Sequence, residues 1–364
     1  MNIAIDCRMI DASGVGTYLD GCLPQFIESK NNLLLIGNKD KLLTYINNKS
    51  NCNIINCNFK PFSFRELLFF PRNIIKQINQ CDLFYSPYFN IPSGIKRPIY
   101  TTIHDIIFPD VPELVSPIGL KARMFFYRRA ARLSKIIFTV SEFSKTRIEF
   151  HLSRQISRYK TPVINASNAI KYDNIEPVPA ENKKKNIIFI GNIKKHKGLG
   201  ILLDAFINCI KTGLDYKLII IGNKNNFRSK DTQILSRLDS LNDGNLIFTG
   251  FLPESEKIKY LSEAALLVQP SLYEGFGFPP LEAMLLGTHA LISDIPVLKE
   301  VYGEFPVIFF KAGDSLDLEK QLMKLLFNKK PRGLTLPSHL KQKYTFKKTV
   351  SIILSQMEKS LNKQ

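Results

Sequence analysis

Short apolar segments separated by helix-length stretches limit the fold of this 364-residue chain more than any other feature of its sequence. Such segments are typical of parallel strands that are buried on both faces and joined by helices. Because two series follow one another, the sequence predicts an α/β protein with two doubly wound domains and a cleft between them. The first series comprises residues 2–6, 33–36, 83–86, 99–104 and 136–140, and the second comprises residues 187–190, 217–221, 246–248, 266–268, 290–293 and 307–310.

The boundary between the two predicted domains is visible in the composition of residues 165–185. This stretch contains two prolines, few large apolar residues and a terminal run of lysines, as is typical of a linker. The chain length also agrees with two domains of about 100–200 residues each. We expect an N-terminal domain over residues 1–170, a linker over 171–185 and a C-terminal domain over 186–344, with a final helix of about residues 345–364 packing back on the first domain.

The composition excludes several classes of protein. Hydrophobic residues make up 45% of the chain and charged residues 23%, which excludes disordered, collagen-like and coiled-coil chains. No apolar run reaches about 18 residues, so we expect no spanning helix, and the first residues lack the pattern of a signal peptide. The six cysteines form no CxxC pair and no metal-like cluster, which indicates reduced thiols in a cytosolic protein.

The net charge points to an anionic partner. Lys and Arg number 50 and Asp and Glu 32, so the excess is 50 − 32 = +18. A nucleic acid, a phosphorylated ligand or a membrane surface would match it. Half of the excess, +9, falls within residues 121–160, where a basic stripe on a predicted helix suits an anionic membrane surface, with a merely solvated basic face as the alternative. At 100° per residue this stripe contains Lys121, Phe125, Arg128, Arg132 and Lys135, and the opposite face contains Phe126, Ala130, Leu133 and Ile137.

A glycine-containing segment follows the first predicted strand. In SGVGTY, residues 13–18, Gly14 and Gly16 permit positive φ and a close approach of the backbone to a diphosphate. The segment lacks the third glycine of the dinucleotide fingerprint, and a plain turn explains it equally well.

The strongest candidate site is VQPSLYEGFGFPPLEAMLLG, residues 268–287. A predicted strand leads into a glycine-rich loop at residues 274–278, and two prolines stand where a helix begins. Free N–H groups and the positive end of the helix dipole predict an anion site there. Glu274 and Glu282 flank this site, and because carboxylates repel phosphate, we expect them to accept hydrogen bonds from sugar hydroxyls.

Two further strand ends carry candidate groups. In GNIKKHKG, residues 191–198, Lys197 is the residue that we expect to neutralise a leaving diphosphate. In TTIHDIIFP, a strand delivers His104 and Asp105, a pair that suits sugar positioning or proton transfer. The other histidines, His151, His196, His289 and His339, are interpreted as structural.

Taken together, these segments resemble glycosyltransferase family 4, the retaining sugar-nucleotide transferases with the GT-B fold. The resemblance covers nearly the whole chain, and its most specific segment has a glutamate pair with seven residues between its members. It implies two Rossmann-like domains that face each other across a cleft, the first for the acceptor and the second for the nucleotide-sugar donor. The segments that occur in the family's order are IDCRMIDASGVGTY, TTIHDIIFPDVPELV, IIFTVSEFSKTRI, NIIFIGNIKKHKG, FTGFLPE and SLYEGFGFPPLEAMLLGT.

The resemblance also implies roles for single residues. Glu274 would contact the donor sugar and stabilise charge at its anomeric centre, with His104 beside the same sugar. Lys197 would bind phosphate, and Glu282 the ribose hydroxyls. Many relatives carry Arg at the position of Asn192, so phosphate binding would depend more on Lys197. The remaining donor-binding positions are Gly14, Gly16, Asn192, Gly275, Phe276, Gly277 and Phe278.

The implied activity is transfer of a hexose from a nucleotide-diphosphate sugar to a growing, lipid-linked oligosaccharide in O-antigen or other surface polysaccharide biosynthesis. The GNIKKHKG and HD variants favour mannose or rhamnose, and no metal or other cofactor is implied. We expect a cytoplasmic protein on the inner face of the cytoplasmic membrane. The alternatives are a sugar-nucleotide epimerase of the same fold and a basic nucleic-acid-binding protein; the second leaves the glutamate pair unexplained.

Overall fold

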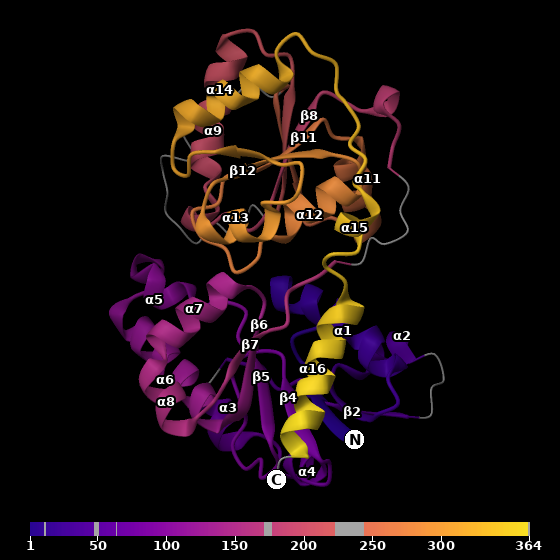
Figure 1. Cartoon of the computed structure of the whole chain (residues 1–364), viewed down its shortest axis with the longest axis vertical. Helices are drawn as coiled ribbons and strands as arrows, with labels where there is room; N and C mark the ends of the chain where they lie inside the picture. Colours follow the sequence, from indigo (N-terminus) through magenta and orange to yellow (C-terminus); the bar gives the residue numbers. More distant parts are fainter. Residues whose placement is uncertain (11, 47–50, 63, 171–176, 223–243, 363–364) are drawn as a thin grey trace. The chain divides into compact units, whose positions relative to one another are not determined.

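The computed structural model describes residues 1–364 with the exception of 11, 47–50, 63, 171–176, 223–243 and 363–364. The chain divides into two compact units (Figure 1). Unit 1 comprises Met1–Lys171 and Tyr344–Gln364, and unit 2 comprises Tyr172–Lys343. The first six residues of the expected linker lie outside the described residues, and the rest of it belongs to unit 2.

Unit 1 contains a parallel sheet in the order β3-β2-β1-β4-β5-β6-β7. The chain starts in the middle of this sheet and adds strands on both sides, which is the doubly wound topology that the sequence predicts. The strands are β1 (Asn2–Asp6), β2 (Asn32–Gly37), β3 (Cys52–Asn56), β4 (Leu83–Ser86), β5 (Ile99–Thr102), β6 (Ser134–Thr139) and β7 (Val163–Asn165). The helices are α1 (Ser13–Glu28), α2 (Lys39–Ile46), α3 (Phe64–Phe69), α4 (Arg72–Ile78), α5 (Ile107–Asp110), α6 (Pro117–Leu133), α7 (Glu142–His151), α8 (Ser153–Tyr159) and α16 (Phe346–Leu361).

Unit 2 repeats this plan with a parallel sheet in the order β10-β9-β8-β11-β12-β13. Its strands are β8 (Asn186–Ile190), β9 (Lys217–Ile221), β10 (Leu246–Gly250), β11 (Leu266–Gln269), β12 (His289–Ser293) and β13 (Ile308–Phe310). Its helices are α9 (Leu199–Lys211), α11 (Glu254–Glu263), α12 (Phe278–Leu285), α13 (Pro296–Tyr302), α14 (Ser315–Leu326) and α15 (Ser338–Lys341). The apolar runs of the second predicted series coincide with these strands to within one or two residues, so two doubly wound units are confirmed.

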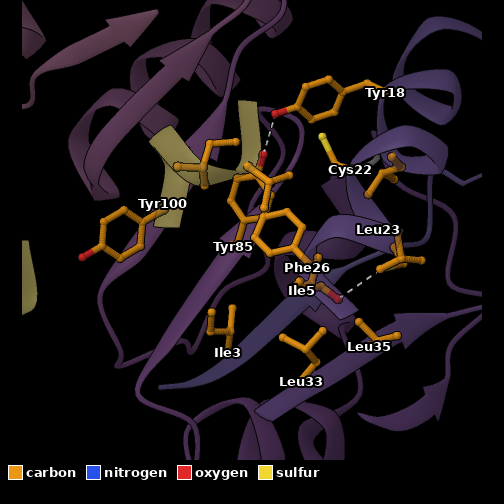
Figure 2. Packing of buried hydrophobic residues seen from close by; sticks show 14 of the residues in the cluster. Ile3, Ile5, Tyr18, Cys22, Leu23, Phe26, Leu33, Leu35, Tyr85 and Tyr100 are labelled. Carbon is orange, nitrogen blue, oxygen red and sulfur yellow. Dashed lines mark hydrogen bonds between the residues drawn. The ribbon is translucent and has the colours of Figure 1, made fainter. Parts of the chain in front are cut away.

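The central strands of unit 1 bury both of their faces. Successive side chains of a strand point to opposite faces of its sheet. On one face Ile3 and Ile5 of β1 pack with Leu23 and Phe26 of α1 (Figure 2), and on the other Ala4 packs in a cluster that includes residues of α4 and α6. Burial on both faces explains why the strands read as continuous apolar runs.

The final helix of unit 1 comes from the far end of the chain. After unit 2 the chain returns to unit 1, where α16 packs against α1 (Figure 1). Val350, Ile353 and Met357 of α16 belong to the same core cluster as Ile3 and Ile5. Each apolar side chain of this size contributes about 1.5–3 kcal/mol when it is fully buried, so α16 is an integral part of unit 1.

Three further properties concern the described residues as a set. All six cysteines are free thiols. No described helix is both long enough and apolar enough to cross a bilayer. Among the residues described, no group of His, Cys, Asp and Glu has the geometry of a metal site.

Candidate active site

The glycine-rich segment of unit 2 lies between the end of β11 and the start of α12. The two prolines occupy the first turn of α12, where a missing N–H costs nothing because it would have no partner inside the helix. Gly277 precedes the helix with φ +85°, and the hydroxyl of Tyr302 donates to its carbonyl. The predicted donor residues Gly275, Phe276, Gly277 and Phe278 therefore form the turn from which α12 starts.

Glu274 is buried in this turn and is held by three donors. Its Oε1 accepts hydrogen bonds from Lys197 Nζ, Gln269 Nε2 and Ser271 Oγ, each at 2.7 Å. Within the described residues, its Oε2 accepts only from Lys197 Nζ, at 2.8 Å. Burial by itself raises the pKa of Glu274, but the Lys197 charge and these hydrogen bonds outweigh it, and the net pKa is below the ordinary value. The carboxylate is therefore ionised at neutral pH.

Lys197 reaches Glu274 because the lysine-rich segment packs tightly against Pro270, in the loop that precedes Glu274. Residues Lys195–Lys197 form a short 3₁₀ turn, and Gly198 follows with φ +71°. A Cβ at position 198 would lie 1.9 Å from the carbonyl oxygen of Pro270, so only glycine permits this approach. Two groups that are 77 residues apart in sequence thus become an ion pair.

Glu282 has a lysine partner of its own. Its carboxylate is buried in α12, and Lys257 Nζ of α11 lies 3.1 Å from Oε1. Lys257 also lies 3.1 Å from Glu254. Burial raises the pKa of Glu282, and the Lys257 charge offsets only part of this effect. Lys257 is absent from the sequence prediction, since nothing in the spacing of residues 257 and 282 indicates their contact.

The other predicted residues of unit 2 lie in the same lysine-rich segment. Asn192 follows β8, and its carbonyl accepts the N–H of Lys194 at 2.9 Å. The adjacent His196 was interpreted as structural, yet its Nδ1 is buried with no hydrogen-bond partner in the described part of the chain. Burial, reinforced by the Lys197 charge, lowers the pKa of His196 to about 4, so the ring is neutral at pH 7.

The structure corrects the expected conformation of Gly14 and Gly16, while their role in donor binding stays a prediction. Both residues lie in the first turn of α1 rather than in a loop, and neither has a positive φ. A Cβ on Gly16 would lie 2.6 Å from the carbonyl oxygen of Ile10, whereas Gly14 has open space around it. Gly16 is therefore explained by close packing of α1 on the preceding turn. Gly14 is exposed at the start of the helix, and because it has no side chain, it exposes only backbone atoms there.

His104 of unit 1 is a neutral imidazole held in a fixed orientation. It follows β5, its Nε2 donates to the Pro87 carbonyl at 2.8 Å, and its ring meets Tyr18 edge to face at 4.8 Å. Burial lowers the pKa of His104 to about 4, and the bond to Pro87 opposes this only in part. The neighbouring Asp105 accepts the N–H of Ile107 at 3.1 Å and so begins α5.

The predicted basic stripe is exposed, but one of its residues is not on the helix. Lys121, Phe125, Arg128 and Arg132 lie on the exposed face of α6, and Phe126 and Ala130 are buried on the other face. The chain passes from α6 directly into β6 at Ser134, so Lys135 and Ile137 belong to a strand. The prediction of a helix through position 137 is therefore wrong. The sequence does not reveal the end of the helix, because no glycine or proline stands between α6 and β6.

Comparison with known proteins gives a family match for the second half of the chain. Residues 171–341 match the family described as glycosyl transferases group 1. The matched residues coincide with unit 2 to within two residues at each end. The Lys197–Glu274 pair, the α12 turn and Glu282 all lie within the matched residues.

Two O-antigen mannosyltransferases and one solved structure are similar to this chain. O-antigen chain mannosyltransferase B of Escherichia coli is 29% identical over 232 residues, or 61% of this chain and 59% of that protein. O-antigen chain mannosyltransferase RfbU of Salmonella typhimurium is 31% identical over 205 residues, or 55% of this chain and 53% of that protein. These matches span between half and three-fifths of the relatives' lengths. Anabaena Alr3699/HepE, solved with UDP and glucose, has a TM-score of 0.74 at 16% identity over 99% of this chain and 100% of that chain, which confirms the GT-B fold.

Sequence reasoning missed several buried polar contacts in both units. Gln269 and Ser271, which hold Glu274, stand beside the motif but carry no signal of their own. In unit 1, the buried Arg8 binds both oxygens of Asp6 and also Glu66, which lies 58 residues away in sequence. Burial, together with the Asp6 charge, raises the pKa of Glu66 to about 7 despite Arg8.

Proposed function

We propose that the chain is a retaining hexosyltransferase. It moves a hexose, with mannose or rhamnose favoured, from a nucleotide-diphosphate sugar to a growing lipid-linked oligosaccharide in O-antigen or other surface polysaccharide biosynthesis. The observation that carries the proposal is the buried Lys197–Glu274 ion pair at the start of α12 in a group 1 glycosyl transferase domain. The similarity to two O-antigen chain mannosyltransferases supports mannose as the sugar.

Donor binding on this proposal exchanges one ion pair for another. The diphosphate binds at the N-terminus of α12, where first-turn N–H groups and the helix dipole favour an anion. Lys197 then turns to the diphosphate. Glu274 Oε2, which accepts only from Lys197 among the described residues, becomes available to the sugar. Gln269 and Ser271 keep Oε1 in place, so the carboxylate stays oriented while its partner changes. Glu282 binds the ribose hydroxyls.

The reaction then requires charge stabilisation more than covalent chemistry. As the bond between the anomeric carbon and the diphosphate oxygen breaks, positive charge develops on the sugar, and the ionised Glu274 stabilises it. Lys197 and the start of α12 stabilise the negative charge on the leaving diphosphate. The acceptor hydroxyl attacks from the same face and gives its proton to the diphosphate, so the configuration is retained. On this proposal His104, whose Nε2 donates to the Pro87 carbonyl, offers the Nδ1 of its neutral ring as an acceptor to a sugar hydroxyl.

The charge of unit 1 supports a proposal for the acceptor and the location. We propose that the protein is cytoplasmic and binds the inner face of the cytoplasmic membrane, where a lipid-linked oligosaccharide resides. The exposed face of α6, with Lys121, Phe125, Arg128 and Arg132, supports this placement because basic residues beside an aromatic ring favour anionic membrane surfaces.

The test measures donor binding and transfer separately. A thermal-shift screen of GDP-, UDP- and dTDP-hexoses should identify one donor, and a donor at about 100 times its Kd should stabilise the protein by about 2.7 kcal/mol. The Glu274→Ala variant should then lose transfer while remaining folded. The control is Lys185→Ala in the same unit, which removes an exposed lysine–carboxylate pair of equal separation, 2.7 Å. Transfer by Glu274→Ala near the parent rate, or release of a free 2-epimer without acceptor, would contradict the proposal.

A further inference from the structure

A basic hollow lies between two packed helices of unit 1. α6 and α8 are in contact (Figure 1), and between them is a cavity of about 310 Å³. Its volume is at the lower end of the range for small-molecule sites, about 300–1,000 Å³. Six basic side chains line it: Lys121, Arg128, Arg129 and Arg132 from α6, and Arg154 and Arg158 from α8.

The basic groups of this hollow have no ion-pair partner among the described residues. Arg129 donates to the Ile91 carbonyl at 2.6 Å and to Ser93 Oγ at 3.1 Å, so it is fixed from outside the hollow. Six like charges at close range repel one another, and a bound anion would remove that repulsion. Five of the six are arginines, whose planar fork matches the oxygens of a phosphate.

Exposed apolar side chains adjoin the same hollow. Phe125 lines it and is 47% exposed, and the ring of Phe64 lies 5.9 Å from the ring of Phe125. Phe64 belongs to α3, where Leu68 and Phe69 are 75% and 67% exposed. Single exposed apolar residues are ordinary, but a group that continues from an unpaired cationic hollow is typical of a membrane interface.

We propose that this hollow is a lipid-headgroup site. The arginines of α6 and α8 hold the phosphate of an anionic lipid, and Leu68 and Phe69 of α3 enter the boundary between headgroups and acyl chains. The apolar group on α3 favours a lipid over a nucleic acid, because a nucleic acid offers it no apolar layer. This site goes further than the proposed exposed face of α6, since α8 supplies four of the nine residues that line it. The inference deepens the proposed function by naming the lipid contact, but the binding itself requires no chemistry in the group 1 domain.

Vesicle sedimentation tests the proposal without any sugar nucleotide. The full chain should sediment at low salt with phosphatidylcholine vesicles that contain phosphatidylglycerol, and not with phosphatidylcholine alone. Each basic residue near such a surface contributes about a factor of five in binding, so Arg154→Glu with Arg158→Glu should weaken it by about 25-fold or more. The matched control, Lys347→Glu with Lys359→Glu, makes the same charge change on exposed positions of α16 and should cost far less.

Two further variants separate a headgroup site from diffuse attraction. Arg128→Lys with Arg158→Lys keeps the charge but removes the forks, and it should weaken vesicle binding several-fold. Leu68→Ser with Phe69→Ser should remove the fraction of binding that persists at high salt. Unchanged binding in either pair, or tighter binding to duplex DNA than to the anionic vesicles, would overturn the proposal. The thermal stabilisation by the sugar-nucleotide donor is measured on the same variants. A variant that loses vesicle binding but keeps this stabilisation leaves the proposed transferase function unaffected.

Discussion

Lys197→Ala tests the ion pair on which the candidate site depends. Glu274 is 8% exposed and the Lys197 side chain 24% exposed, so the pair is largely out of water. Removing one partner of a buried pair costs about 3–5 kcal/mol, since the other charge is left unpaired. Gln269 and Ser271 still donate to Oε1 in the variant. We therefore expect the free energy of unfolding of unit 2 to fall by about 2–3 kcal/mol at neutral pH.

The pH dependence of the loss identifies its cause. In the parent chain the pKa of Glu274 is lowered, so its ionisation stabilises the fold above the unfolded-state value of 4.5, and this contribution is lost as the pH falls. Without Lys197 the effect of burial dominates, and the pKa of Glu274 rises above 4.5. The variant then becomes less stable as the pH rises, so its deficit against the parent should grow between about pH 4 and pH 7.

Urea unfolding followed by far-UV circular dichroism measures this effect, since the chain contains no tryptophan to report by fluorescence. The double variant Lys197→Ala with Glu274→Gln removes the unpaired charge and should recover a large part of the loss. Lys185→Ala, whose exposed pair with Asp215 has the same separation of 2.7 Å, should change stability by less than about 1 kcal/mol. A Lys197→Ala loss no greater than this control, or a loss that is constant with pH, would refute the reasoning.

Two other predictions concern His104 and the approach of the lysine segment. Burial keeps the folded-state pKa of His104 near 4, below its ordinary 6.5, so the parent protein loses stability as the pH falls from about 6.5 to 4. In urea titrations at pH 5.5, His104→Gln should remove up to about 1 kcal/mol of this loss. Gly198→Ala should destabilise by more than about 2 kcal/mol and weaken donor binding, whereas Gly213→Ala, at φ +93° with open space around it, should cost only the backbone strain of about 1–2 kcal/mol. Equal losses of unfolding free energy in the two glycine variants would show that the contact of position 198 with Pro270 does not contribute to the destabilisation.

The apolar runs predict the interior strands of both sheets, but they do not predict the edge strands of the unit 1 sheet. β3 and β7 are the two outer strands of the unit 1 sheet and are absent from the predicted series. The sequence of β3 is CNIIN with no buried residue, and that of β7 is only VIN. An edge strand has one neighbour and less cover, so it needs no continuous apolar run. The same pattern that identifies a central strand therefore cannot identify these two.

The site is predictable only where its residues share one segment. The α12 turn and both glutamates stand within residues 268–287, and the proline and glycine positions indicate a helix start by local rules. The partners of these glutamates, Lys197 and Lys257, come from other segments, and the arginines of α8 approach α6 only through the packing of two helices. Such contacts depend on the folded path of the chain, which periodicity does not encode.

The return of the chain to unit 1 has a consequence for biosynthesis. α16 completes the core around Ile3 and Ile5, yet a ribosome makes it only after all of unit 2. Synthesis proceeds at about 5–20 residues per second, so the apolar face of α1 stays uncovered for roughly 10–30 s while unit 2 is made. Unit 2 is contiguous and can complete its own core during that interval. We therefore expect the second unit to be finished before the first, and a nascent chain stalled before residue 344 to be a substrate for chaperones.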